Sequence, residues 1–311
     1  MTDDGVRLGI AVNDELLTPD PARRRGILDH IEAVGLDHLT VGDHISFHGG
    51  IGFDGLVAAT AALTSNDRLR VQIGVYLAGL RHPMATARSL ATLTQLAPGR
   101  LVLGVGVGGE DRSEISNMGV DPATRGRRTD ETLALLRRLA TGEVVDHHGA
   151  FFSLENARIL PAQEPRVPIV IGGAGEVAVR RTAEHGDGWL GMWCSARRYA
   201  ATHEQLLAAF AERGRGAPSF AGFNVWVGLG GDPTTARLRL GERMSQLYQL
   251  PPEKFEHVTA AGRPEDVAEF LAPYIAGGAR TVTLIPVADD VDTAIDLCGE
   301  VRRLLAATVP A

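Results

Sequence analysis

The 311-residue sequence predicts an α/β fold in which eight parallel strands close into a (β/α)8 TIM barrel, with insertions after the fourth and the seventh strand. Eight apolar runs rich in Val, Ile and Leu recur along the chain, and helical patterns separate them. Continuous apolar strands that alternate with helices are typical of a parallel sheet covered by helices. Because no linker or composition shift divides the chain, we expect a single barrel domain over residues 1–311.

The eight expected strands are spread along the whole chain. In order, they cover residues 6–12, 36–42, 70–77, 100–107, 167–173, 186–193, 220–230 and 279–287. Apolar residues recur every three to four positions over 81–96, and the stretch 262–278 has a proline in its first turn and glycines at its end. Both patterns indicate helices.

Two longer stretches interrupt the alternation. Residues 142–166 contain short strand-like pieces and a proline-bounded segment before the fifth strand, and residues 231–261 follow the seventh strand. Long loops on a barrel are commonly lids or substrate walls. We therefore expect the first stretch to be an insertion on the active-site face and the second to be a further excursion.

Composition excludes several classes of partner. The formal net charge of −7 provides no basic field for nucleic acid or for anionic membranes, so neither is an expected partner. No run reaches the roughly 18 apolar residues of a spanning helix, and the first residues lack a basic and then apolar leader, so we expect a cytoplasmic protein. Cys194 and Cys298 show no CxxC spacing and are expected to be reduced and buried.

Titratable residues end the second expected strand. In a barrel the site lies at the carboxyl ends of the strands, which is where Asp43 and His44 stand. A His beside an Asp can exchange a proton or hydrogen-bond a heterocycle near neutral pH. The alternative is an Asp that caps the following turn, with the His packed against it. His48 lies four residues after His44, but two glycines follow at once, so we expect no metal site.

Glycines follow the fourth and the fifth strand. Gly104, Gly106 and Gly109 formally satisfy G-x-G-x-x-G, but a polar loop follows instead of the helix that a dinucleotide fingerprint requires. They either let a flat ring lie against the strand end or serve tight packing. The residues Gly173–Gly175 stand between a strand and a helix start, where backbone N–H groups suit a phosphate. A tight βα turn explains the same residues equally well.

Four segments, taken in order, resemble the luciferase-like monooxygenase superfamily and, more narrowly, its branch of coenzyme F420-dependent oxidoreductases. They are "VGDH" at 41–44 and the stretches 80–110, 147–193 and 262–287. The resemblance implies a luciferase-like barrel that binds a flavin-like cofactor at the carboxyl ends of its strands. It also implies a homodimeric oxidoreductase that transfers a hydride between the deazaflavin F420 and a small organic substrate.

The same resemblance assigns roles to individual residues. His44 is implied as the catalytic proton donor or acceptor beside the ring, and Gly74 with Val75 as a strand-three bulge with a non-proline cis peptide that supports the ring. The full set of implied cofactor contacts is Asp43, His44, Gly74, Val75, Gly106, Gly108, Gly173, Ala174 and Gly175. Of these, Gly106 and Gly108 belong beside the ring or its side chain, and the last three belong at the phosphate.

Alternatives of cofactor and of class stay open. The flavin-mononucleotide (FMN) branch shares the barrel and much of the glycine pattern, so an FMN-dependent monooxygenase with a partner flavin reductase is the alternative. A hydrolase that uses His44 as general base and a cofactor carrier without turnover are hypotheses of another class. No nucleophile with an adjacent base supports the hydrolase, since Ser46 follows His44 too closely to indicate a triad. The substrate is not identified.

Overall fold

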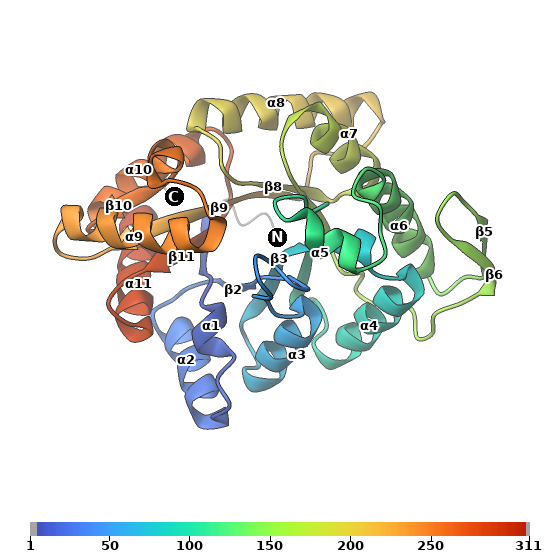
Figure 1. Ribbon diagram of the computed structural model, residues 1–311, viewed down its shortest axis with the longest axis horizontal. Helices are drawn as coiled ribbons and strands as arrows, with labels where there is room; N and C mark the ends of the chain where they lie inside the picture. Colours follow the sequence, from blue (N-terminus) through green and yellow to red (C-terminus); the bar gives the residue numbers. More distant parts are fainter. Residues whose placement is uncertain (1–4, 309–311) are drawn as a thin grey trace. The chain divides into compact units, whose positions relative to one another are not determined.

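The computed structural model describes residues 5–308 (Figure 1), and the chain divides into two compact units. Unit 1 comprises residues 1–40 and 188–311, and unit 2 comprises residues 41–187. Each unit is a parallel sheet with helices packed on it.

Unit 2 is built on three parallel strands. They are β3 (Arg70–Tyr76), β4 (Leu101–Val105) and β7 (Ile169–Gly172), and β4 pairs with both of the others. The helices are α3 (Gly55–Ser65), η1 (Ala78–Leu80), α4 (Pro83–Leu96), α5 (Arg112–Asn117), α6 (Arg125–Leu139) and α7 (Gly175–His185). Helix α3 packs on β3, α7 packs on β7, and α4 lies beside α6.

Local signals explain where the helices of unit 2 begin. Pro83 occupies the first turn of α4, and the His82 ring accepts a hydrogen bond from the Met84 N–H at 3.2 Å. Asp54 caps α3 in the same way, through the N–H groups of the first turn. The expected helix over 81–96 is therefore confirmed.

Unit 1 is built on a longer parallel sheet. Its strands are β1 (Arg7–Ile10), β2 (His38–Val41, which ends at the unit boundary), β8 (Gly188–Gly191), β9 (Phe220–Leu229), β10 (Ala260–Gly262) and β11 (Thr281–Val287). They pair in the order β8, β9, β11, β1, β2, and β10 pairs with the last residues of β9, 227–229, beyond the residues 220–223 that pair with β8. The helices are α1 (Asn13–Leu16), α2 (Pro21–Ala33), α8 (Ala196–Glu212), α9 (Pro233–Tyr248), η2 (Pro252–Lys254), η3 (Glu256–Val258), α10 (Pro264–Ala276) and α11 (Val291–Thr308).

All eight expected strands are present, but the two longer stretches differ from each other. Residues 142–166 contain an antiparallel hairpin of β5 (Val145–His148) and β6 (Ser153–Ala157), as the strand-like pieces predict. Residues 231–261 are not a long loop, because most of them form helix α9, whose start the Asp232 side chain caps. The expected excursion after the seventh strand is therefore present, and it is largely helical.

The remaining expectations about composition concern the cysteines and membrane segments. Cys194 and Cys298 are buried and form no disulfide, as predicted. Burial raises the pKa of the Cys194 thiol to about 11 and also raises the pKa of Cys298. None of the helices between residues 5 and 308 is both long and apolar enough to cross a membrane.

Candidate active site

Asp43 is a buried charged residue that stands two positions after the end of β2. Its side chain is 0% exposed and accepts four hydrogen bonds: from the N–H groups of Gly55 at 2.8 Å and Leu77 at 2.9 Å, and from both terminal nitrogens of Arg81 at 2.7 and 2.8 Å. A carboxylate with two oxygens is saturated by such a set. The Asp43 side chain therefore fixes the turns before α3 and after β3, and its expected contact with a cofactor stays a prediction.

Arg81 joins this network to a second carboxylate and to a ring. Its guanidinium donates to Asp54 at 2.9 Å and lies 4.3 Å from the centre of the Tyr76 ring. Burial raises the pKa of Tyr76 to about 12. Arg81 was not predicted as a site residue from the sequence. It is the first charged residue after the third strand, so it is a natural partner for an acid at the end of the second strand.

His44 occupies a different environment from its neighbour. Its side chain is 35% exposed, and its ring stacks on Phe47 with the ring centres 4.3 Å apart. The Nδ1 atom lies 3.2 and 3.3 Å from the two carboxylate oxygens of Glu114. Since an ionised carboxylate only accepts hydrogen bonds, Nδ1 carries the proton. Nε2 then presents its lone pair, and no described residue hydrogen-bonds to it.

Glu114 holds the histidine in this orientation. It stands in the first turn of α5 with its side chain 3% exposed, and it also accepts hydrogen bonds from the N–H groups of Ile45 at 2.7 Å and Ser46 at 3.2 Å. The role of Glu114 as a partner of His44 was not predicted from the sequence, because 70 positions separate the two residues. The available signal was the cluster of acids directly after the glycines of the fourth strand, "GGEDRSE".

Asp111 adds a second attachment between α5 and the loop after β2. It caps α5 through the Ser113 N–H at 2.8 Å and accepts the His48 N–H at 2.9 Å. The Ser113 hydroxyl and these N–H groups lower the pKa of Asp111 to about 2. Both histidines of the loop are thus held by carboxylates of α5. Within residues 5–308, no group of three or more His, Cys, Asp or Glu side chains is arranged to hold a metal ion.

Val75 lies where β3, β4 and β7 meet. The strand β3 has an irregular register between Ile73 and Tyr76, and the Gly74–Val75 peptide is cis, so the predicted place of the bulge and the cis peptide is confirmed. A Cβ added at Gly106 or Gly172 would lie only 2.4 or 2.9 Å from the Val75 side chain. These two glycines therefore make room for Val75.

Gly104 serves packing in another way. An added Cβ there would lie 2.2 Å from the Ile73 carbonyl oxygen, which belongs to the backbone and cannot move aside as a side chain can. Between the two hypotheses for Gly104, this contact favours tight packing.

Two further turns carry the remaining predicted residues. Gly108 has a φ of +67°, and its carbonyl accepts a hydrogen bond from Arg125 Nε at 3.1 Å. Gly173 and Gly175 have φ values of +122° and +78°, and Ala174 begins α7 without a side-chain cap. An uncapped helix start that follows such glycines presents backbone N–H groups to an anion.

The predicted residues thus form two groups within unit 2. Val75 contacts Gly106 and Gly172, and Gly172 leads directly into the turn Gly173–Gly175. His44 is joined to Glu114 on α5.

The sequence as a whole decides the family. Residues 6–230 match the profile of the luciferase-like monooxygenase family, which is well over half of the chain. The chain belongs to the luciferase-like monooxygenase family. The resemblance inferred from the four segments is confirmed.

Relatives of this luciferase-like chain include enzymes that use a deazaflavin. An F420-dependent glucose-6-phosphate dehydrogenase of Rhodococcus hoagii is 32% identical over 194 residues, which are 60% of this chain and 57% of that protein. The chain spans only 46–63% of the length of such curated relatives.

Solved structures show the fold. An F420-dependent secondary alcohol dehydrogenase in complex with an F420–acetone adduct superposes with a TM-score of 0.82 at 19% identity, over 96% of this chain and 98% of that one. The oxygenating component of the 3,6-diketocamphane monooxygenase of Pseudomonas putida, in complex with FMN, gives 0.73 at 15% identity, over 98% and 99%. The predicted (β/α)8 barrel of luciferase-like type is thereby confirmed.

Proposed function

We propose that this luciferase-like protein is an F420-dependent oxidoreductase that transfers a hydride between the deazaflavin and a small organic substrate. The observation that carries the proposal is the His44–Glu114 pair, which leaves His44 Nε2 unbonded and its side chain 35% exposed. The pair provides a positioned proton acceptor, which a dehydrogenase needs beside the site of hydride transfer. The F420-dependent relatives, at about 32% identity, support the choice of cofactor.

The residues of unit 2 fit a deazaflavin. Val75, set into the space that Gly106 and Gly172 leave open, would support the ring. Gly106 and Gly108 would lie beside the ring or its side chain, and the N–H groups of Gly173–Gly175 at the start of α7 would hold the phosphate. When bound, the deazaflavin supplies a carbon that accepts or gives a hydride and reacts poorly with oxygen.

The chain's own residues would manage the proton. As the carbon of a substrate alcohol loses its hydride, Nε2 of His44 takes the hydroxyl proton and the carbonyl forms. Glu114 stabilises the resulting imidazolium and keeps the ring in one orientation. In the opposite direction the imidazolium returns the proton to the oxygen. Phe47, stacked on His44, limits rotation of the imidazole.

A screen of alcohols and carbonyl compounds tests this function directly. The purified chain is incubated with oxidised F420 and each alcohol, and loss of the absorbance of oxidised F420 is followed. We expect turnover with at least one small alcohol, and a loss of turnover without loss of F420 binding in His44→Gln. Turnover that is unchanged in His44→Gln would contradict the proton-transfer role.

The alternative and the quaternary structure have their own tests. Oxygen consumption on addition of reduced FMN, with no reaction of F420, would support an FMN-dependent monooxygenase, which the fold similarity to an FMN-bound component keeps open. We also propose that the protein is a cytoplasmic homodimer. Light scattering after gel filtration would give the mass of the assembly, and a monomer would contradict the dimer.

A further inference from the structure

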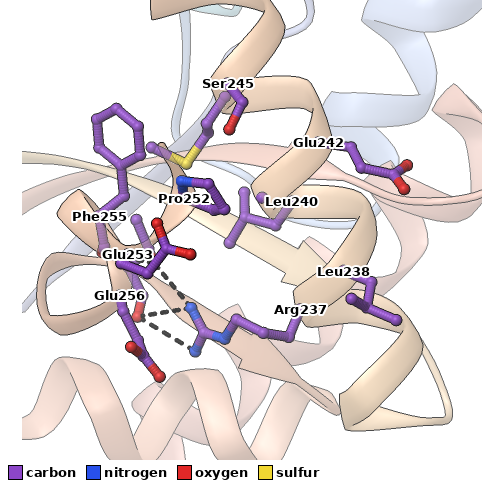
Figure 2. A pocket seen from close by; sticks show the side chains of 12 residues that line it. Arg237, Leu238, Leu240, Glu242, Ser245, Pro252, Glu253, Phe255 and Glu256 are labelled. Carbon is purple, nitrogen blue, oxygen red and sulfur yellow. Dashed lines mark hydrogen bonds between the residues drawn. The ribbon is translucent and has the colours of Figure 1, made fainter. Parts of the chain in front are cut away.

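Unit 1 contains a groove that the proposed redox function does not use. The groove has a volume of about 410 Å³ and lies between α9 and the segment of η2 and η3 (Figure 2). Pockets for small molecules start at about 300 Å³, so this one has room for a single small ligand.

The floor of the groove is apolar. Leu240, Met244 and Phe255 line it and are 1%, 0% and 6% exposed. At the mouth, Leu238 is 62% exposed, which is unusual for so large an apolar side chain. An apolar group of a ligand would gain free energy mainly by covering Leu238, because the floor residues are already almost fully buried.

The wall contains a cation, Arg237, and the acid Glu256, which also lines the groove, lies near it without forming an ion pair in the described structure. Arg237 is half-buried, and its hydrogen bonds go to the hydroxyl and the carbonyl of Thr259, the shortest at 2.8 Å. No carboxylate among the described residues forms an ion pair with it. Burial lowers the pKa of Arg237, and the nearby Glu256 opposes this effect. A guanidinium has five N–H donors, so several remain for a ligand.

An acid lines the same groove. Glu253 of η2 is exposed and points toward the space that Arg237 enters from α9, whereas Glu242 points away from both (Figure 2). Arg237 and Glu253 are oppositely charged but form no ion pair with each other. In addition, the Ser245 hydroxyl is buried without a hydrogen-bond partner in the described structure. Such a group indicates a missing partner, because an unsatisfied buried hydroxyl costs free energy.

We propose that this groove binds an apolar α-amino acid as a zwitterion. Its carboxylate would pair with Arg237, its ammonium group with Glu253, and its side chain would cover Leu238, the exposed apolar residue of the lining. A ligand with a carboxylate but no ammonium group would leave Glu253 without a partner. A ligand with an ammonium group but no carboxylate would leave Arg237 without one. A phosphate dianion would meet one arginine and a repelling carboxylate.

Isothermal titration calorimetry on the full chain, without any deazaflavin, tests the proposal. The ligands are L-phenylalanine, phenylpropanoate, which lacks the ammonium group, and phenylethylamine, which lacks the carboxylate. We expect phenylalanine to bind at least about tenfold more tightly than either analogue, since each lost charge-assisted hydrogen bond is worth about that factor or more. This series uses the unmodified chain, so it does not depend on any variant folding.

Two charge variants test the residues. Arg237→Gln and Glu253→Gln should each weaken phenylalanine binding at least about tenfold. The matched controls are Arg25→Gln and Glu269→Gln, which remove an exposed charge elsewhere in unit 1 and should leave binding unchanged. Circular dichroism establishes that each variant is folded. No heat of binding with phenylalanine, equal affinity for phenylpropanoate, or normal binding by Glu253→Gln would overturn the proposal.

Discussion

The substitution Glu114→Gln probes the proton-transfer account most closely. Oε1 of Glu114 accepts hydrogen bonds from the N–H groups of Ile45 and Ser46 and lies 3.2 Å from His44 Nδ1, whereas Oε2 hydrogen-bonds to His44 Nδ1 alone, at 3.3 Å. A glutamine can keep Oε1 on the two N–H groups and place its NH2 group against Nδ1. Because that group donates, Nδ1 must then accept, and the proton moves to Nε2.

The magnitudes follow from these contacts. Hydrogen bonds to a charged acceptor contribute about 1.5–3 kcal/mol and neutral ones about 0.5–1.5 kcal/mol, so the variant should lose only about 1 kcal/mol of unfolding free energy. Proton transfer should suffer far more, because Nε2 can no longer act as the base. A positioned acid or base contributes about a hundredfold to ten-thousandfold, and kcat should fall by that factor while F420 binding is kept.

Nitrogen-15 NMR of the histidine rings measures the tautomer without any substrate. In the parent protein we expect His44 to be protonated on Nδ1, and in Glu114→Gln on Nε2. The matched control is Glu110→Gln, an exposed acid of the same loop, which should change neither the tautomer nor the turnover. A His44 ring already protonated on Nε2 in the parent, or a Glu114→Gln variant that turns over at the parental rate, would refute the reasoning.

Four further substitutions, one of them a matched comparison, have defined outcomes. Asp43→Asn should lower the unfolding free energy measured in urea by about 3–5 kcal/mol, because it breaks a buried ion pair. Asp54→Asn, at an acid whose side chain is 43% exposed, should cost less than about 1 kcal/mol, and equal effects would contradict the structural role of Asp43. Gly106→Ala places a Cβ 2.4 Å from Val75 and should weaken F420 binding in a fluorescence titration about tenfold; parental affinity would argue against a ring site there. Burial raises the pKa of Glu131, but hydrogen bonds from a histidine and from backbone N–H groups outweigh it, so the net pKa is lowered. The ionised Glu131 carboxylate stabilises the folded state above its unfolded-state pKa, and this stabilisation is lost as the pH falls through its folded-state pKa. The difference in unfolding free energy between the parent and Glu131→Gln should therefore shrink from about pH 6 to about pH 3. A difference that grows toward low pH would contradict this role.

The sequence predicted the strands well for a physical reason. Each strand of a covered parallel sheet is apolar on both faces, so a run such as 167–173 is visible without knowledge of its neighbours. Helix α9 was not foreseen, because its charged and apolar residues alternate irregularly, although Asp232 and Pro233 at its start are a cap signal that could have indicated it.

The site was predictable where it depends on local sequence. His44 and the glycine turn before α7 follow strands, and the structure places them there, whereas the bulge at Gly74–Val75, which the family resemblance implied, lies within β3. Glu114 and Arg81 were not predicted as partners, since each is brought to its histidine or acid by the crossover from one strand to another and only weak local signals marked them. The same contacts distinguish Asp43, saturated by the protein, from its neighbour His44, which keeps a nitrogen for chemistry.

Two parallel fluorescence titrations, one with oxidised F420 and one with FMN, test the central claim most directly. The account predicts tight binding of F420 and weak binding of FMN to the purified chain, with F420 binding reduced in Gly106→Ala. Tight binding of FMN with weak binding of F420 would contradict the proposed deazaflavin chemistry, and binding of neither would contradict the assignment of the cofactor site in unit 2.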